Sequence, residues 1–346
     1  MATHLVTGSS GFVGSAIVKK LHQIGEKIIS VDITEDKELS KISDFYNLDI
    51  SNQNSNFTDA FKDVDVVHHN AALVPLTKSG KKFFEANAIG TENVLNASVK
   101  SGVKHISHMS SSAIFGKPKK NNNVDSNTLK PTGVYGYSKY LAEQEVLKRF
   151  NKKDKFFESV SIIRPRPIIG PERLGIFEIL FDWVNDNRKI PIIGDGKNNF
   201  QFAHINDLVD VSIETSQKKL SGFFNIGTDK FSTLGEDLNE AFKLSGSKSK
   251  VFPIPKILCV PPLYIMDKIN LSPLTSWHYL SYDWNFYYDQ VENFKRLSWR
   301  PYMSNVEMIC EGYKWYIENL NSVKKNQSIH RGSVNQKLLK YVKKIF

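Results

Sequence analysis

The sequence has few cysteines, and this scarcity argues against two kinds of site. Its 346 residues include two cysteines, Cys259 and Cys310, and neither belongs to a CxxC pair or to a Cys/His ligand spacing. A disulfide framework and a structural zinc site are therefore not expected. We predict no metal site and a reducing compartment.

The sequence also lacks the patterns that direct a chain into or across a membrane. It opens with MATHLVTG, a strand-like run without the basic and then apolar start of a signal peptide. Its most apolar later stretch, IPKILCVPPLYIMDKI, is broken by prolines and charges and is shorter than a membrane span. We therefore expect a soluble, cytoplasmic protein.

The last part of the chain lacks acidic residues. Seven of the ten excess positive charges lie within residues 322–346, as Lys324, Lys325, Arg331, Lys337, Lys340, Lys343 and Lys344. The remaining chain is close to neutral and shows neither a basic face nor a recognition motif for nucleic acid. A nucleic-acid partner is therefore not predicted.

The terminal segment 321–346 has the pattern of a basic amphipathic helix. Val334, Leu338, Val342 and Ile345 fall on one helical face, and the lysines fall largely on the other. Such a helix can lie on an anionic membrane surface. A solvated or packed terminal helix explains the pattern equally well, so both interpretations stay open.

Short apolar strands alternate with amphipathic helices along most of the chain. This alternation is typical of a parallel sheet that helices cover on both faces. We therefore predict a doubly wound α/β fold. Strand-like runs lie at residues 3–7, 27–33, 45–50, 64–72, 105–112 and 159–165, and helix-like runs lie at 11–25, 81–102 and 134–151.

The alternation weakens from about residue 228, where a proline-rich stretch precedes helices near 289–297 and 304–320. We interpret this part as a smaller substrate domain that is partly interleaved with the first domain. The nucleotide-binding domain is expected at 1–173 with 200–227 returning to it, the substrate domain at 174–199 and 228–320, and the tail at 321–346.

A glycine-rich loop joins the first strand to the first helix. The stretch TGSSGFVGSAIVKKL places Gly8, Gly11 and Gly14 between the two elements. Glycines at such a turn let the backbone approach a pyrophosphate, which the helix N-terminus stabilises. A dinucleotide site is therefore predicted here.

The second strand ends in an acidic residue that favours NAD. Asp32 can accept hydrogen bonds from the ribose hydroxyls of an adenosine. Thr34, Glu35 and Asp36 follow it, and they offer no arginine to a ribose 2′-phosphate. NAD is therefore predicted in preference to NADP.

The stretch VYGYSKYLAEQEV contains two tyrosines that can be told apart by helix geometry. Tyr135 and Lys139 are four residues apart and share a helix face, whereas Tyr137 points elsewhere. A neighbouring ammonium and a cationic nicotinamide would both favour the Tyr135 phenolate. Tyr135 is therefore the candidate to accept a proton from a substrate alcohol.

In combination, the motifs resemble those of the extended short-chain dehydrogenase/reductases, specifically the NAD-dependent epimerase/dehydratase family. The resemblance covers residues 3–320 and implies a Rossmann domain with a small C-terminal substrate domain. It also implies a homodimer formed through helices, including the one that carries Tyr135. The motifs are, in chain order, TGSSGFVG, HHNAA, NAIGTENVL, HMSSSAIFG, YGYSK, IIRPRPIIGP and FNIG.

The resemblance also assigns roles to individual residues. It makes Tyr135 the catalytic acid/base and Lys139 its activator and ribose-binding partner. It places Asp49 and Ile50 at the adenine, and it makes Asn87 a support for the cofactor site. The implied cofactor-binding set is Gly8, Gly11, Phe12, Val13, Gly14, Asp32, Asp49, Ile50, Ala71, Ala72, Asn87, Lys139 and Pro165.

Three consecutive serines compete for the role of the active hydroxyl. Aligning IFG of this chain with the VYG of the family without a gap selects Ser111. Strand alternation places Ser110 and Ser112 on the face opposite Ser111. Mutation of each serine can distinguish these alternatives.

Several reactions of the family need groups that this chain lacks. Sugar dehydratases resembling it carry an Asp-Glu pair after the active hydroxyl, where this chain has Ser112 and Ala113. Decarboxylating relatives place a Glu there, and 3,5-epimerase/reductases need a nearby Cys. We therefore expect 4-epimerisation or simple alcohol/ketone redox chemistry.

The contacts to a substrate diphosphate differ from those of the family. Nucleotide-sugar enzymes usually show an Asn and an Arg at the positions that Pro167 and Phe200 occupy here. Guanidinium groups elsewhere could replace them, although Arg300 in the turn LSWRP could instead only close the domain. The candidate substrate contacts are Ser112, Arg166, Arg173 and Arg300.

Three functions therefore stay open. The leading hypothesis is an NAD-dependent enzyme that acts on the hydroxyl of a nucleotide-linked or lipid-linked sugar. The stretch IIGDGKNNFQFAHINDLV is also similar to 3β-hydroxysteroid dehydrogenases, which keeps a hydrophobic secondary alcohol as an alternative. A non-catalytic NAD-binding scaffold is the third hypothesis.

Overall fold

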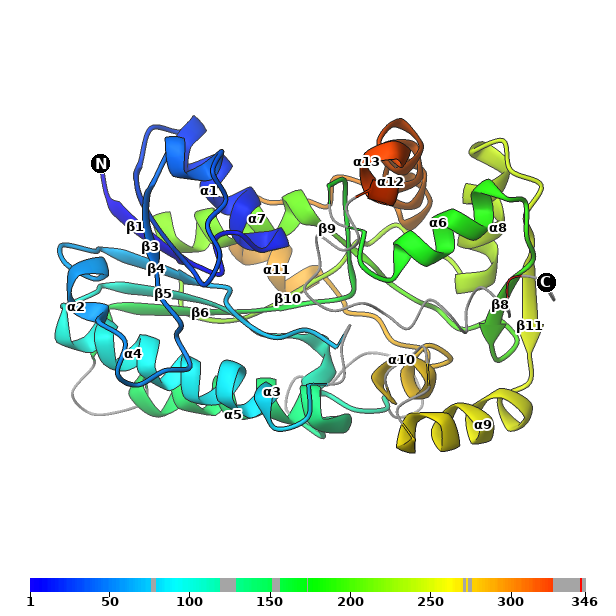
Figure 1. Cartoon of the computed structure of the whole chain (residues 1–346), viewed down its shortest axis with the longest axis horizontal. Coiled ribbons are helices and arrows are strands. Elements are labelled where there is room, and N and C mark those ends of the chain that lie inside the picture. The colour runs from blue at the N-terminus through cyan, green and yellow to red at the C-terminus, as the bar shows by residue number, and fades with distance from the viewer. Residues whose placement is uncertain are drawn as a thin grey trace.

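The computed structural model describes residues 1–75, 79–118, 129–150, 156–172, 174–269, 272, 276–325 and 343. Figure 1 shows a parallel sheet covered by helices at one end of the molecule and a smaller, mostly helical part at the other end. The chain passes between these two parts several times, as the colour sequence in Figure 1 shows.

Seven parallel strands form the main sheet in the order β10-β6-β5-β4-β1-β2-β3. The order reverses between β1 and β4, so the predicted doubly wound α/β fold is confirmed. Apolar residues on both faces hold the sheet between its helices, and Leu5 for example lies between Ile29 and Val67. The strands are β1 Thr3–Thr7, β2 Lys27–Asp32, β3 Asp44–Asn47, β4 Val66–His69, β5 His105–Met109, β6 Ser159–Pro165 and β10 Gly222–Ile226.

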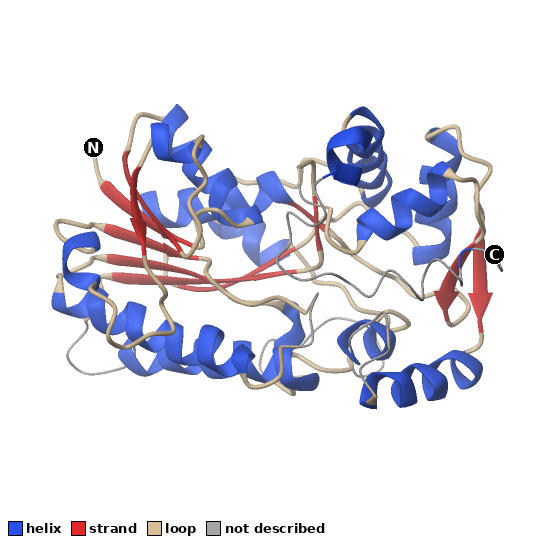
Figure 2. Cartoon of the chain, in the orientation of Figure 1, coloured by secondary structure: helices blue, strands red, loops and turns tan. Residues whose placement is uncertain are grey.

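Helices cover both faces of this sheet, as Figure 2 shows. On one face, α1 Phe12–Gln23 packs against α7 Ile205–Gln217 through Ile17, Leu21 and Val209. On the other face lie α2 Phe57–Ala60, α4 Gly90–Lys100 and α5 Gly133–Phe150, with Phe61, Val94 and Val146 in the core. The helix expected from 134 to 151 is therefore present as α5.

The smaller part has its own apolar core. Phe181, Phe242 and Met308 bring three of its helices together. A two-stranded parallel sheet of β8 Ile190–Ile193 and β11 Val251–Ile254 borders this core. The helices are α6 Phe177–Asn185, α8 Leu234–Leu244, α9 Lys256–Lys268, α10 Ser276–Ser281, α12 Asn305–Glu318 and α13 Leu320–Lys325.

Short elements connect the two parts. The strands β7 Ile168–Ile169 and β9 Ala203–His204 pair with each other. The helix α11 Val291–Arg296 follows a segment that contains Trp284, Phe286 and Tyr288. The three-residue turns Leu39–Lys41 and Ser112–Ile114 are 3₁₀ helices.

Two segments differ from the sequence-based expectation. The helix expected at 81–102 consists of α3 Lys82–Phe84, a π-helical turn Glu85–Ile89 and α4. The proline-rich stretch after residue 255 forms the helix α9 although Pro261 and Pro262 lie inside it. Proline in a helix interior removes a hydrogen-bond donor, which is why the sequence pattern did not indicate a helix there.

The tail prediction for residues 321–346 falls largely outside the described residues. Within it, the Nζ atom of Lys343 lies 2.7 Å from Asp186 Oδ2 in an ion pair. Among the described residues, no helix combines the length and apolarity needed to cross a bilayer.

Candidate active site

The glycines Gly8, Gly11 and Gly14 at the junction of β1 and α1 leave no room for a Cβ atom. Gly8 adopts a φ of +67°, and a Cβ atom there would lie 2.7 Å from the backbone nitrogen of Ala71. A Cβ atom on Gly14 would lie 2.1 Å from the carbonyl oxygen of Gly8, and one on Gly11 would lie 2.9 Å from the same oxygen. Such a bare backbone at the start of a helix fits a dinucleotide pyrophosphate.

Asp32 borders this loop from the end of β2. Its Oδ2 accepts a hydrogen bond from the Ser10 backbone N–H at 3.1 Å, and its Oδ1 accepts one from the Thr34 N–H at 3.1 Å. The Asp32 carboxylate thereby holds both the glycine-rich loop and the loop after β2. Phe12 and Val13 begin α1 directly after the loop.

The other residues of the implied cofactor set follow strands of the same sheet. Asp49 and Ile50 come after β3, and Ala71 and Ala72 come after β4, whereas Pro165 ends β6. Because all strands are parallel, their carboxyl ends meet at one edge of the sheet, where doubly wound folds bind ligands. The structure thus brings these residues to the edge that carries the glycine loop.

Replacing Gly14 by alanine tests whether the loop must stay bare. The added methyl group would clash with the Gly8 carbonyl, so we expect Gly14→Ala to lose about 3 kcal/mol of unfolding free energy and to lose NAD binding. Urea denaturation and calorimetric titration with NAD measure the two effects. Gly25→Ala is the control for NAD binding, since no atom lies within 4 Å of a Cβ at Gly25 and the φ of +79° there should cost an alanine only about 1 kcal/mol of stability. Normal NAD binding by Gly14→Ala would contradict this interpretation of the loop.

Tyr135 and Lys139 lie on the first turns of α5, facing the end of β5. The Nζ atom of Lys139 donates a hydrogen bond to the Met109 carbonyl oxygen at 2.7 Å. Tyr135 is hydrogen-bonded to the Ser111 side chain. Tyr137, in contrast, is about half exposed. The structure therefore groups Ser111, Tyr135 and Lys139 and leaves Tyr137 outside, as the helix geometry predicts.

The electrostatics of this group differ from the sequence-based expectation. Burial raises the pKa of Tyr135, and the hydrogen bond with Ser111 opposes this rise. Burial lowers the pKa of Lys139 to about 8, against the raising effect of Glu143. Among the protein's own groups, Ser111 rather than Lys139 thus favours the phenolate.

The three consecutive serines have three different partners. Ser110 donates a hydrogen bond to Glu143 Oε2 at 2.8 Å, and Ser112 accepts one from Arg166 Nη1 at 3.4 Å. Ser111 is next to Tyr135, and its Oγ also accepts a hydrogen bond from the Ala113 N–H at 3.1 Å. Of the three, Ser111 is the one that the structure places beside Tyr135.

Glu143 was not among the residues selected from the sequence. It is buried one turn after Lys139 on α5 and forms an ion pair with Arg164 of β6. Its spacing of four residues from Lys139 is a sequence signal for their proximity. The ion pair with Arg164 has no such signal, because the two residues come from different elements.

Asn87 connects the loop after β4 to α5. Its Oδ1 accepts a hydrogen bond from the Leu73 N–H at 2.7 Å, and its Nδ2 donates to Ser138 Oγ at 3.0 Å. The π-helical turn around Asn87 places the side chain between these partners. Asn87 therefore joins the loop after β4 to α5, and its role in supporting the cofactor stays a prediction.

Arg166 is a buried arginine in an aromatic environment. Its Cζ atom lies 3.9 Å from the ring centre of Phe286 and 4.7 Å from that of Phe200. Its Nε donates to the Gln201 carbonyl oxygen at 3.2 Å. Within the described ranges, Nη2 has no hydrogen-bond partner and no carboxylate pairs with the guanidinium. Burial lowers its pKa to about 10.

The other two arginine candidates do not join this group. Arg173 lies outside the described residues. Arg300 donates hydrogen bonds to the carbonyl oxygens of Leu297, Trp299 and Phe294. These contacts support the interpretation that Arg300 closes the turn after α11.

A cluster of buried aromatic residues packs against Tyr135. Gln201 fixes part of it, since its Oε1 accepts a hydrogen bond from the Tyr288 N–H at 2.9 Å. No sequence pattern indicates this cluster, because most of its members come from the segment after residue 228, where the alternation of strands and helices is weak. We call it the aromatic cluster; its members are Phe115, Trp277, Trp284, Phe286 and Tyr288.

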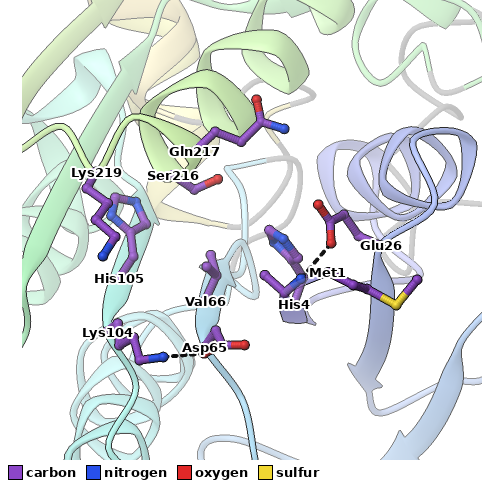
Figure 3. A pocket seen from close by; sticks show the side chains of 11 residues that line it. Met1, His4, Glu26, Asp65, Val66, Lys104, His105, Ser216, Gln217 and Lys219 are labelled. Carbon is purple, nitrogen blue, oxygen red and sulfur yellow. Dashed lines mark hydrogen bonds and ion pairs between the residues drawn. The ribbon is translucent and has the colours of Figure 1, made fainter.

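A hollow at the opposite edge of the sheet is unrelated to these residues. Figure 3 shows that it lies between the N-terminus, the beginnings of β4 and β5, and the end of α7. Two hydrogen bonds span parts of it, from Ala2 N to Glu26 at 2.7 Å and from Lys104 to Asp65 at 2.7 Å. Ligands of doubly wound sheets bind at the carboxyl ends of the strands, so this hollow is not the candidate site.

The buried state of Lys139 predicts a pH-dependent stability. A lysine in the unfolded chain keeps a pKa near 10.4, whereas folding lowers the pKa of Lys139 to about 8. The stability of the folded chain should therefore rise with pH between these two values. We expect Lys139→Met to be more stable than the wild type at pH 7 by about 3 kcal/mol and to lose this advantage near pH 10.

Urea denaturation of both proteins across this pH range measures the difference. Lys148→Met is the control, because Lys148 lies largely exposed on the same helix. A Lys139→Met difference that stays constant with pH would show that the lysine is not desolvated.

The sequence matches one family model and is similar to several known proteins. The model of the NAD dependent epimerase/dehydratase family matches residues 4–227. The uncharacterized protein y4nG of Sinorhizobium fredii is 34% identical over 338 residues, which are 97% of this chain and 84% of y4nG. An ADP-L-glycero-D-manno-heptose-6-epimerase of Brachyspira hyodysenteriae is 27% identical over 272 residues, covering 72% of this chain and 84% of that protein.

Solved structures share the fold. The UDP-glucuronic acid 4-epimerase of Bacillus cereus, solved in complex with NAD, superposes with a TM-score of 0.72 at 20% sequence identity. The match covers 91% of this chain and 99% of that chain. At this identity the likeness concerns the fold alone.

Proposed function

The chain belongs to the NAD-dependent epimerase/dehydratase family, and we propose that it is an NAD-dependent enzyme that acts on a sugar hydroxyl in the manner of a nucleotide-sugar 4-epimerase. The observation that carries this proposal is the grouping of Ser111, Tyr135 and Lys139 at the end of β5. When bound, NAD supplies the hydride acceptor for the substrate alcohol. The glycine loop and Asp32 would hold it.

Each residue of the group has a distinct task in this proposal. Tyr135 accepts the proton of the substrate hydroxyl as a general base. Ser111 donates a hydrogen bond to the same substrate oxygen. Lys139, with a pKa of about 8, is largely protonated at neutral pH, and its ammonium group can donate hydrogen bonds to the ribose of the cofactor.

Arg166 supports a substrate with an anionic group. A buried guanidinium without a carboxylate partner is unfavourable unless a ligand pairs with it. The planar donors of arginine suit a phosphate. We therefore assign Arg166 to the diphosphate of a sugar nucleotide, in the place of the polar residues that Pro167 and Phe200 replace.

A specific observation also favours the alternative, a dehydrogenase of hydroxysteroid type. The aromatic cluster beside Tyr135 would suit a hydrophobic secondary alcohol. Such an enzyme would convert free NAD to NADH with an apolar alcohol, and a 4-epimerase would not. The remaining hypothesis is a non-catalytic scaffold, which would bind NAD without turnover. The grouping of Ser111, Tyr135 and Lys139 argues against it.

Thermal shifts of the NAD-saturated protein test the proposed substrate class. UDP, dTDP, GDP and CDP are added separately, because a ligand that binds only the folded state raises the melting temperature. We expect one of the four nucleotides to stabilise the protein. Stabilisation by none of them, together with NADH formation from an apolar alcohol, would overturn the nucleotide-sugar assignment.

Single substitutions of the three serines test the choice of the active hydroxyl. We expect Ser111→Ala to lower turnover by about 100-fold, because it removes a hydrogen bond to the reacting oxygen. Ser112→Ala should weaken substrate binding through Arg166, and Ser110→Ala should mainly lower stability through its lost bond to Glu143. The kcat and KM of the three variants and their melting temperatures separate these effects.

A further inference from the structure

The helix α9 exposes an apolar surface at the edge of the smaller part. None of its residues is buried, and Figure 1 shows it on the outside of the molecule beside α10. Ile257, Leu258 and Ile265 are 80%, 65% and 61% exposed. Tyr264 and Ile269, at the end of the helix, are each more than half exposed.

These exposed residues fall on one side of the helix. With 3.6 residues per turn, the exposed positions cover about 160° of the circumference. The opposite side turns toward α10, where Asp267 Oδ2 accepts a hydrogen bond from Tyr279 Oη at 3.0 Å. A helix on a protein surface normally presents polar residues outward, whereas α9 presents apolar residues, two prolines and Lys268.

Basic and aromatic side chains flank this surface. The Nζ atom of Lys268 lies 5.4 Å from the ring centre of Tyr264. On β11, which leads into α9, Phe252 is partly exposed and has the Lys189 Nζ atom at 5.7 Å from its ring centre. Lysines paired with aromatic rings around an apolar centre are the composition of a membrane-water interface.

The two prolines argue for a partner that can hydrate the backbone. Pro261 and Pro262 have no N–H group, so the carbonyl groups of Ile257 and Leu258 lack the usual helical donor. Water and lipid headgroups can satisfy such carbonyls at a bilayer surface, whereas a dry interface between proteins could not without a matching donor.

We propose that α9, together with Phe252, docks on the surface of a lipid bilayer that contains anionic lipid. The apolar side chains enter the boundary between headgroups and acyl chains, and Lys189 and Lys268 face the anionic headgroups. This proposal does not depend on the proposed reaction. It would place the active site near the bilayer, because α9 packs on α10 and α10 packs on α5.

Co-sedimentation of the full chain with vesicles tests the proposal. We expect the wild type to sediment with mixed phosphatidylcholine and phosphatidylglycerol vesicles, and the combined variant Ile257→Gln, Leu258→Gln, Ile265→Gln to bind at least about 10-fold more weakly. Leu244→Gln is the matched control, because Leu244 is also 66% exposed but lies on α8. Melting temperatures confirm that the variants fold.

Three results would overturn the proposal. The first is a wild-type protein that does not bind the mixed vesicles. The second is a combined variant that binds as tightly as the wild type while neutralisation of Lys337, Lys340 and Lys344 abolishes binding, which would assign the contact to the tail. The third is self-association that the combined variant loses without any vesicle binding, which would make α9 an interface between copies.

Discussion

Replacing Tyr135 by phenylalanine should lower turnover by about 10²–10⁴-fold, the usual contribution of a positioned general acid/base. The substitution removes one hydroxyl group and keeps the ring against Phe83 and the aromatic cluster. NAD binding and the melting temperature should therefore change little. Turnover is measured with the nucleotide sugar that stabilises the protein, and NAD binding is measured by calorimetry.

Tyr137 provides the control for this prediction. It lies two residues away on the same helix, is about half exposed and stacks on Tyr140. We expect Tyr137→Phe to turn over substrate at nearly the wild-type rate. If Tyr135→Phe kept full activity, neither the assigned base nor the proposed mechanism would stand.

Replacing Arg166 by methionine should have two effects of opposite sign. Without a ligand, the variant should be more stable than the wild type by about 1–2 kcal/mol, because an unpaired buried charge is removed from among Phe200 and Phe286. Its affinity for the stabilising nucleotide should fall by about 10- to 100-fold, since hydrogen bonds between charged groups are lost.

Thermal unfolding with and without the nucleotide measures both effects in one experiment. Arg300→Met is the control, because the Arg300 guanidinium is bound to carbonyl groups of its own turn. A less stable Arg166→Met variant with unchanged nucleotide affinity would assign Arg166 a purely structural role. Weakened nucleotide binding in Arg300→Met would restore that residue as a substrate contact.

The parts of the site that sequence reasoning predicted depend on local patterns. The loop of Gly8 and Gly14 follows a strand and opens a helix, so its position at the sheet edge could be inferred. Helix periodicity distinguishes Tyr135 from Tyr137, because residues four apart share a face and residues two apart do not. The structure places both features as these short-range rules predict.

The remaining features depend on contacts between distant segments. Arg166 lies between Phe200 and Phe286, which are separated by 86 residues, and no periodicity links them. The pKa of Tyr135 depends on burial by several elements. Helix spacing therefore indicates Lys139 as the group that favours the phenolate, whereas the structure shows that the hydrogen bond with Ser111 lowers the Tyr135 pKa. Tertiary packing likewise overrides local propensity in α9, where two prolines lie inside a helix.

The most direct test of the central claim is proton NMR of the NAD-loaded protein with the nucleotide sugar that stabilises it. The account predicts that resonances of the C4 epimer appear until the two sugars reach equilibrium, without accumulation of NADH, and that Tyr135→Phe does not produce them. An unchanged sugar spectrum with wild-type protein that binds both NAD and the nucleotide would contradict the account.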